Sequence, residues 1–217
     1  DVHVRDCEDT PALTKASENG HESIVELLLD RGADVDATNE YSWTALMAAC
    51  WSGHESLAKM LVARGADLNL CDEHSRTALL LACEKRREGT ALLLVESGAE
   101  LESKDNSGNK ALGEACKRGL EKVAQLLLEK KAAVNAENNT GQTPLMVACA
   151  SGNLNMAELL VAQGADVNAS TFFGTRALDV VRNTRNDGSD EVVSRTRGIE
   201  QLLLSKGATE GEKKFQE

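Results

Sequence analysis

Short apolar stretches alternate with polar, glycine-containing stretches along the whole chain, and their order returns every 33 residues. In one period the apolar side chains of Leu46, Ala49 and Cys50 fall on one face of a short helix, and Leu57 to Ala63 predict a second helix. A glycine follows each helix, as expected of a residue that adopts positive φ readily. The sequence therefore predicts a series of like helix pairs, marked by Leu13, Leu46, Leu79, Leu112, Leu145 and Leu178.

The polar stretch between one helix pair and the next, such as Asp34 to Trp43, is predicted to form an extended finger with a turn at its tip. A single unit of this kind cannot bury its own apolar face, so neighbouring units must stack. Stability then comes from the contacts between adjacent units. We therefore expect an elongated molecule without one shared central core.

The period divides residues 1–209 into one domain of six units, at about 1–42, 43–75, 76–108, 109–141, 142–174 and 175–209, followed by a polar tail at 210–217. The chain starts within a finger, because Asp1–Val4 match Asp34–Ala37 one period later. If an earlier unit exists, it would cover the first helix pair.

Two places depart from the period. Leu202–Leu204 lie 43 residues after Leu159–Val161, so the last unit holds ten additional residues. They fall around Asn183–Glu191, whose Asn-Asp-Gly-Ser segment predicts an exposed loop between the two helices. Lys131 stands where other units have glycine. A lysine with positive φ costs about 1 kcal/mol, so the turn either keeps its shape at that cost or changes it.

Several motifs recur in register with this period. Thr143-Pro144-Leu145 opens a first helix, Gly53-His54 separates two helices, and Gly164 to Asn168 reads Gly-Ala-Asp-Val-Asn. These residues resemble the ankyrin-repeat family, whose units contain TPLHxAA, a central GH, LLL and GADVN. The resemblance covers nearly all of the chain, although Arg86-Arg87 replace Gly-His in one unit. It implies an all-α ankyrin-repeat solenoid of stacked helix-turn-helix units with extended finger loops.

The resemblance also implies a protein-protein interaction module, in which finger tips and the exposed side of the first helices present a concave surface to a protein or peptide. The net charge of -11 disfavours nucleic acid as a partner and mildly favours a basic one. No apolar run approaches the ~20 residues of a membrane span, so no membrane insertion is expected. We expect a monomer.

Nothing in the sequence predicts catalysis, a metal site or a cofactor. The cysteines include four at the repeat period, Cys50, Cys83, Cys116 and Cys149, and no pair has the Cys-x-x-Cys spacing of a zinc or redox site. A catalytic group would be unique to one unit, whereas residues that recur at the repeat period, such as these cysteines, serve every unit. Buried, unpaired cysteines fit a reducing compartment, so an intracellular location, cytoplasmic or nuclear, is expected.

Large aromatic and charged residues that break the repeat are the candidate partner contacts. Both tryptophans lie in the second unit and the only tyrosine in the finger that leads into it, and tryptophan and tyrosine are enriched at binding hot spots. We predict one groove from Tyr41 to Arg118 and a second contact at the last finger. The alternative is that Trp43 packs against its own finger and Trp51 covers the next helix. The candidates are Glu40, Tyr41, Trp43, Trp51, Glu73, His74, Arg76, Glu84, Asn109, Lys117, Phe172 and Phe173.

Other functions stay open at this stage. The chain could be a regulatory or targeting ankyrin segment of a larger enzyme or channel. A narrower alternative is a methyl-lysine peptide reader, because Tyr41, Trp43, Trp51 and Glu84 supply the aromatic and acidic groups of a cation-binding cage. The divergence among units argues against an engineered consensus repeat.

Overall fold

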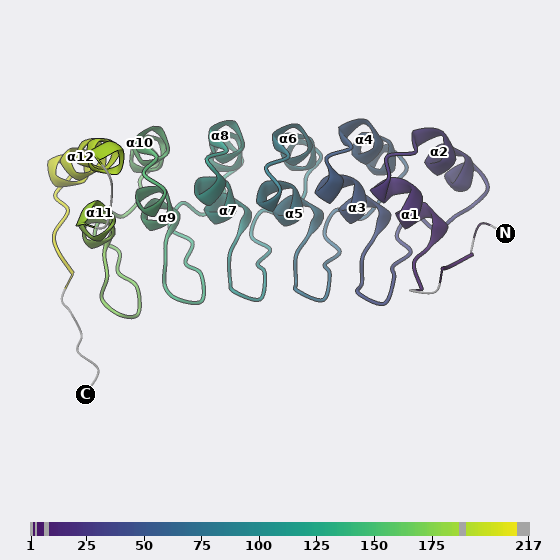
Figure 1. The fold of residues 1–217 in the computed structure, drawn as a ribbon, viewed down its shortest axis with the longest axis horizontal. Helices are drawn as coiled ribbons and strands as arrows, with labels where there is room; N and C mark the ends of the chain where they lie inside the picture. The colour runs from purple at the N-terminus through teal and green to yellow at the C-terminus, as the bar shows by residue number, and fades with distance from the viewer. Residues whose placement is uncertain (1, 3, 7–8, 187–189, 212–217) are drawn as a thin grey trace. The chain divides into compact units, whose positions relative to one another are not determined.

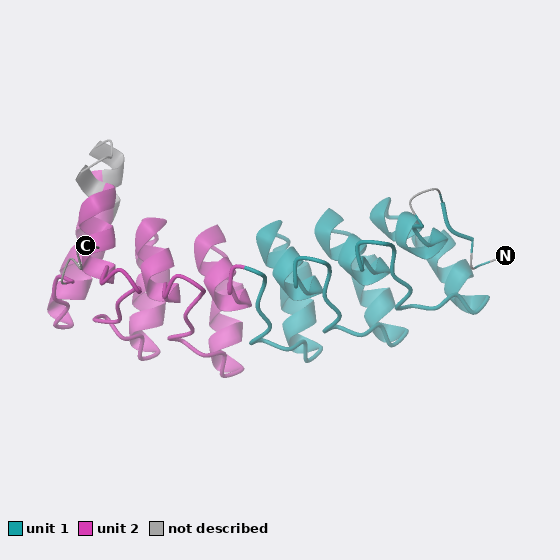
Figure 2. Ribbon diagram, turned by 90° about the horizontal axis from the view of Figure 1, so that it is seen from below, with its two compact units in different colours: residues 1–106 teal, residues 107–217 magenta. Residues whose placement is uncertain are grey.

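The computed structural model describes residues 2, 4–6, 9–186 and 190–211 (Figure 1). Within these residues every regular element is an α-helix and no strand is present. The chain divides into two compact units, residues 1–106 and 107–217 (Figure 2). Each unit is a stack of helix pairs joined by extended fingers, which confirms the predicted architecture.

In unit 1, three helix pairs stand side by side, and a finger follows each pair (Figure 1). The first helix of each pair lies in one row and the second helix in a neighbouring row. The fingers project from the row of first helices, away from the second helices (Figure 1). The helices are α1 (Ala12–Glu18), α2 (Glu22–Asp30), α3 (Ala45–Ser52), α4 (Glu55–Ala63), α5 (Ala78–Glu84) and α6 (Glu88–Glu96).

Unit 2 repeats this arrangement, with first helices in one row and second helices in the other (Figure 1). Its last pair is the longest, at 10 and 16 residues. The helices are α7 (Ala111–Arg118), α8 (Glu121–Glu129), α9 (Pro144–Ala150), α10 (Leu154–Ala162), α11 (Ala177–Asn186) and α12 (Asp190–Ser205).

Threonine hydroxyls start several of the first helices. The Oγ1 atom of Thr44 accepts a hydrogen bond from the N–H of Met47 at 3.2 Å, and Thr77 caps α5 in the same way. Thr143 caps α9, where Pro144 occupies the first turn. A side-chain oxygen at this position satisfies a backbone N–H that has no partner inside the helix. The threonine side chain therefore fixes the start of the helix at these three positions.

The turn after α8 keeps the shape found in the other units although a lysine replaces glycine. Lys131 has a φ of 71°. Its N–H donates to the carbonyl oxygen of Leu128 at 3.0 Å, and the next N–H, of Ala132, donates to Leu127 at 2.9 Å. In unit 1 the N–H groups of Gly65 and Ala66 make the corresponding bonds. Of the two possibilities, the turn keeps its shape at a conformational cost.

Lys131→Gly should therefore raise the free energy of unfolding by about 0.5–1 kcal/mol, because glycine adopts this φ without a Cβ clash. Urea denaturation would measure the change. Lys130→Gly is the matched control, because Lys130 has a φ of -80°. Glycine there gives no such relief, so an equal gain in both variants would contradict the explanation.

The core lies between successive helix pairs, as the stacking argument requires. Ile24 in α2 is 48% exposed, whereas Leu57, one period later in α4, is 0% exposed. In unit 1, α4 lies between α2 and α6, while α2 has a neighbouring pair on one side (Figure 1). Thr90, Val123 and Met156, which occupy this position in the next three repeats, are also buried. Burial here depends on a neighbouring pair and not on the residue's own unit.

The predicted exposed loop at Asn183–Glu191 is wrong for its described part. Residues 183–186 are the last turn of α11, and residues 190 and 191 begin α12. The central residues 187–189 lie outside the described chain. Most of the ten additional residues therefore lengthen helices.

Packing between α11 and α12 accounts for this difference. Val181 in α11 and Ile199 in α12 are both 0% exposed. The Nε of Arg182 donates to the Oε1 of Glu200 at 2.9 Å and links the two helices. An asparagine in a helix costs only about 0.5 kcal/mol relative to alanine. These tertiary contacts outweigh the turn preference of Asn183 and its neighbours.

Candidate partner-binding surface

The finger tips of unit 1 are tight turns closed by one side chain each. The Oδ1 atom of Asn39 accepts hydrogen bonds from the N–H groups of Tyr41 at 3.0 Å and Trp43 at 2.9 Å. Asp72 does the same in the next finger, one period later. A short polar side chain that binds its own backbone in this way fixes a turn. The side chains at the two tips are therefore held in defined positions.

Neighbouring fingers in unit 1 are joined through their backbones. The N–H of Glu73 donates to the carbonyl oxygen of Tyr41 at 3.2 Å. The N–H of Asn106 donates to the carbonyl oxygen of His74 at 3.1 Å. We call residues 34–43 and 67–76, together with the exposed side of α1, the finger surface of unit 1. Its fingers form a continuous hydrogen-bonded wall.

A cleft of about 310 Å³ is present in this finger surface. Residues of α1 and its N-terminal approach line it together with both fingers. Tyr41 is 48% exposed, so its ring is accessible. The structure brings together five predicted site residues, Tyr41, Trp43, Glu73, His74 and Arg76, and adds Thr10, Thr14, Lys15, Glu18, Asn39 and Asp72.

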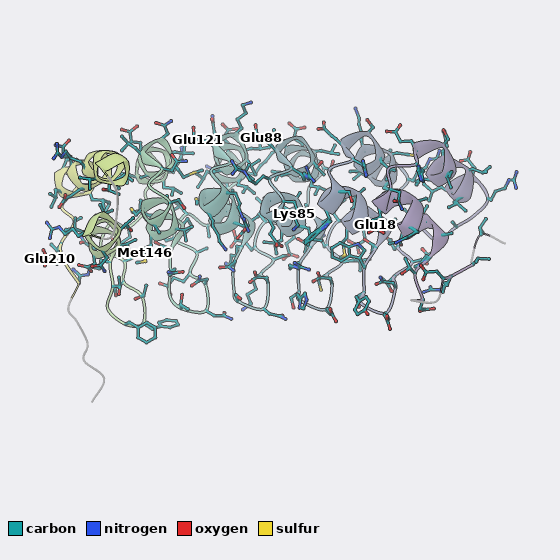
Figure 3. All side chains as sticks on the ribbon, in the orientation of Figure 1. Glu18, Lys85, Glu88, Glu121, Met146 and Glu210 are labelled. Carbon is teal, nitrogen blue, oxygen red and sulfur yellow. The ribbon has the colours of Figure 1, made fainter. Side chains whose placement is uncertain are left out.

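Trp51 lies beside this cleft and interacts with basic side chains of the chain itself. Its ring meets that of Trp43 edge to face, with centroids 5.7 Å apart and planes at 79°. The Nζ atom of Lys85, labelled in Figure 3, lies 3.5 Å from the Trp51 ring centroid, and the Cζ atom of Arg76 lies 5.5 Å from it. Trp51 is thus already engaged in intramolecular cation–π contacts.

Arg76 is held by two carboxylates. It donates to Asp72 at 2.8 Å and to Glu84 at 3.0 Å. The side chain of Asp72 is 2% exposed, so this pair is shielded from water on one side. A guanidinium with two acidic partners has its charge compensated within the protein. Arg76 therefore forms a fixed wall of the cleft.

Two further carboxylates line the cleft, one from α1 and one from a finger. Glu18, labelled in Figure 3 near the end of α1, pairs with Lys15 at 2.9 Å. The Oε1 atom of Glu73 lies 3.6 Å from the Nε2 of His74. The side chains of Glu18 and Glu73 are 53% and 51% exposed. Both acids are accessible to a partner.

Not all predicted residues of unit 1 share this cleft. Glu40 is exposed at the finger tip, and neither it nor Trp51 nor Glu84 lines the cleft. The four residues suggested for a methyl-lysine cage therefore do not surround one cavity. Lys85 lies over Trp51, and Arg76 is bonded to Glu84.

The remaining candidates lie in unit 2, so the predicted groove from Tyr41 to Arg118 is divided between the units. Asn109 accepts a hydrogen bond from the Nδ2 of Asn138 at 3.2 Å. Lys117 is exposed, and its Nζ lies 3.9 Å from Glu114. The Nε of Arg118 donates to the same carboxylate at 2.7 Å. This part of the prediction corresponds to a local charge cluster on α7.

Phe172 and Phe173 are the most exposed large apolar residues of the described chain, at 63% and 60%. The N–H of Phe172 donates to the carbonyl oxygen of Thr140 at 3.3 Å, which ties its finger to the preceding one. A smaller cleft of about 240 Å³ is lined by Phe173 together with Arg182 and other residues. The two rings form an accessible apolar patch in unit 2.

Six lining residues of the unit 1 cleft were missed from the sequence, among them four from α1 and its approach: Thr10, Thr14, Lys15 and Glu18. They precede Tyr41 by more than 20 residues, and they reach the cleft because α1 stacks beside the next pair. One signal was available, since Thr14 occupies the position at which ankyrin motifs have histidine. The polar residue there marked a departure from the pattern.

Comparison with known proteins identifies the repeat. The family model described as "Ankyrin repeats (3 copies)" matches residues 1–72 and 98–171. The chain belongs to the ankyrin-repeat family. Ankyrin repeats are generally protein-protein interaction modules.

Solved ankyrin structures agree with the fold. The ankyrin-repeat domain of Bcl-3, a member of the IkappaB family, has 30% identity and a TM-score of 0.74, and the match covers 91% of this chain and 86% of that one. The human ASB11 ankyrin-repeat domain has 25% identity and a TM-score of 0.75, covering 91% and 84%.

A third similar chain comes from the complex of the predatory endopeptidase Bd0816 of Bdellovibrio bacteriovorus with the immunity protein Bd3460. It has 24% identity and a TM-score of 0.75, and the match covers 88% of this chain and 99% of that one. At this identity the likeness concerns the fold. No curated protein sequence matches the chain significantly.

The histidine of the Gly-His motif, which separates the two helices of a pair, has a structural role here. The Nε2 of His54 lies 3.1 Å from the carbonyl oxygen of Glu18 in the preceding pair. One period later, the Nε of Arg87 donates to the carbonyl oxygen of Trp51 at 3.3 Å. Both side chains bond the end of the preceding first helix. Arg87 therefore replaces the histidine of the Gly-His motif in this contact between neighbouring helix pairs.

The described residues offer neither a group of three metal-ligating side chains nor a helix long and apolar enough to cross a membrane. The periodic cysteines Cys50, Cys83, Cys116 and Cys149 are buried, whereas Cys71 is exposed. Burial raises the pKa of Cys149 to about 12 and also raises that of Cys50. These thiols act as small apolar core groups.

Iodoacetamide should accordingly label Cys71 in the native protein much faster than Cys50 or Cys149, because the reactive species is the thiolate. Mass spectrometry of digested samples would give the rates. Labelling in urea is the control, in which all described cysteines react. Fast native labelling of Cys149 would contradict its place in the core.

Proposed function

We propose that this chain is a protein-protein interaction module that binds a protein or peptide partner through the finger surface of unit 1. The observation that carries the proposal is the cleft, which joins residues from three successive repeats around an accessible Tyr41. Partial exposure of an aromatic ring in a concave, polar-rimmed site is typical of a binding hot spot.

The rigidity of the surface supports the same function. Asn39 and Asp72 fix the finger tips, and backbone bonds join the fingers. A surface that is already ordered loses little conformational entropy when a partner binds. We propose a binding mechanism in which several repeats present their side chains together, within a single domain of residues 1–209.

The proposed partner is a basic protein or peptide, in keeping with the net charge of -11. We propose that nucleic acid is not bound, that the chain is monomeric, and that it acts inside the cell, in the cytoplasm or nucleus. Catalysis is not part of the proposal, because the recurring polar residues serve turns and caps. Phe172 and Phe173 are proposed as a secondary partner contact in unit 2.

Tyr41→Ala should weaken partner binding at least about tenfold while the folded state is kept, since truncating an aromatic hot spot typically costs 2 kcal/mol or more, roughly 30-fold in affinity. Capture from lysate with the unaltered chain would supply the partner, and calorimetry would compare variants. Leu204→Ala, which truncates an equally exposed apolar residue of α12 outside both proposed contacts, is the matched control. Equal affinities of Tyr41→Ala and the unaltered chain would refute the role of the finger surface of unit 1.

A further inference from the structure

We propose that the open face of the first helix pair, α1 and α2, is a repeat interface that takes a further ankyrin-type helix pair on its N-terminal side. This inference goes beyond the proposed function, because it concerns the end of the repeat stack in unit 1 and not the finger surface. What the members of this open face share is that no helix pair covers them. They are Val4, Ala12, His21, Ile24, Leu27 and Leu28.

The open face is apolar, as the surface of an internal repeat is. Ile24 and Leu27 are 48% and 52% exposed, and Val4 is 56% exposed. A hollow of about 430 Å³ lies on this face, with Val4, Ala16 and Ile24 among the residues that line it. Repeat proteins end in capping repeats whose outer face is polar. The first helix pair therefore lacks the surface of a capping repeat.

The corresponding positions are covered in the repeats that follow, where a helix pair precedes them. Leu28 is half-buried, whereas Leu61 and Leu94, at the same position in the next two repeats, are buried. Ala12 is half-buried, whereas Ala45 at the same position is buried. The open face thus carries the residues of a repeat interface without the contact that a preceding pair supplies.

His21 supplies a polar sign of the same interface. The side chains at its position in the next two repeats bond the end of the preceding first helix: His54 lies at the carbonyl oxygen of Glu18, and Arg87 donates to that of Trp51. His21 is exposed, and its ring has no hydrogen bond within the described chain. The histidine of the Gly-His motif is therefore present here without the helix end that it bonds elsewhere.

These contacts define the helix pair that fits. A Cβ atom on Gly20 would lie 2.6 Å from the Cε1 of His54, so the ring can approach only because a glycine follows the first helix. A pair that stacks on His21 needs such a glycine, as Gly53 provides in the second repeat. The last pair of a second copy of the chain has Arg185 at this position, within α11. A second copy is therefore not the expected occupant.

The segment before α1 has the geometry of a finger that joins two helix pairs. Arg5 and Pro11 form the backbone bridge that recurs in later fingers. Asp9 has a φ of 53°, and Ser42, one period later at the tip of the next finger, has a φ of 58°. The later fingers each lead from the second helix of one pair to the first helix of the next. We therefore expect the added pair to be continuous with this finger in the polypeptide.

Addition of residues 44–66, which contain α3 and α4, directly before Asp1 tests the inference in register, because an aspartate follows Ala66 in both sequences. Amide hydrogen exchange in α2 should slow at least about tenfold in the extended chain, since a covered repeat opens less often. The same residues attached after Glu217 are the control and should leave exchange in α2 unchanged. Unchanged exchange after the N-terminal addition would overturn the inference.

Ile24→Ala tests whether the added pair stacks on the open face itself. The substitution should lower the equilibrium constant for folding at least about 30-fold in the extended chain and less than about fivefold in the original chain. Leu204→Ala, which truncates a 49% exposed residue of α12, is the matched control and should have the same effect in both chains. Urea denaturation followed by circular dichroism gives the constants. Equal effects of Ile24→Ala in the two chains would overturn the inference.

Analytical ultracentrifugation of the original chain tests the other occupant, a second copy. We expect a single monomeric species at all concentrations. A dimer that is lost in the Ile24→Ala variant would assign the open face to a second copy and overturn the inference.

Discussion

Leu57→Ala should lower the free energy of unfolding by about 3 kcal/mol, whereas Ile24→Ala should lower it by less than about 1 kcal/mol. The two residues occupy the same position in successive repeats. Leu57 is 0% exposed and Ile24 is 48% exposed. The difference arises because α4 has neighbouring helix pairs on both sides in unit 1 and α2 on one (Figure 1).

The cost at Leu57 combines the lost transfer free energy of the side chain with the cavity that remains. Alanine at Ile24 leaves no closed cavity, because water already reaches that face. Urea denaturation followed by circular dichroism would measure both variants. Similar losses at the two positions would mean that stacking of neighbouring pairs does not set the burial.

Asp72→Ala should destabilise the protein by about 2–4 kcal/mol, because one side chain accepts hydrogen bonds from two backbone N–H groups and from a guanidinium. Its Oδ1 atom accepts from the N–H groups of His74 and Arg76, and its Oδ2 atom accepts from the Arg76 guanidinium. The side chain is 2% exposed. Alanine removes both the turn-closing bonds and the buried partner of Arg76.

The repeat itself provides the matched control. Asn39 and Asn138 occupy the position of Asp72 in other units and accept the same two backbone bonds. Asp72→Asn should therefore cost only about 1 kcal/mol, since the finger turn stays closed and Arg76 keeps Glu84. A cost for Asp72→Asn equal to that of Asp72→Ala would assign the whole effect to the ion pair.

The fold was predictable because its signals are local and repeated. A capping threonine, a glycine with positive φ and an apolar helix face lie within one unit, and their recurrence gives the stacking. Lys131 was harder, because only the tertiary fold determines whether a lysine accepts the glycine conformation. Its φ of 71° indicates that the repeat geometry is stronger than the preference of that residue.

The site was predicted in part, because binding surfaces are assembled across repeats. The aromatic residues Tyr41 and Trp43 stood out by composition. The α1 side of the cleft did not, since Thr14 and Glu18 reach it only through stacking. Trp51 was counted as a partner contact, but Lys85 from the next repeat lies over its ring. Such contacts join residues 34 positions apart and leave no local sequence signal.

The loop at Asn183–Glu191 illustrates the opposite error, in which a local signal was overridden. Its turn-forming residues predicted exposed coil, but its described part continues the two helices, in which Val181 of α11 and Ile199 of α12 are fully buried. The length of α12 follows from that packing and not from the propensity of the additional residues.

Photo-crosslinking tests the central claim, partner binding at the finger surface of unit 1, most directly. Tyr41→benzoylphenylalanine places the reactive group at the cleft, and Lys59→benzoylphenylalanine places it at an exposed position of α4. With the captured and purified partner, the account predicts a crosslinked product from position 41 and little from position 59. Crosslinking from position 59 alone, or equally from both, would contradict it.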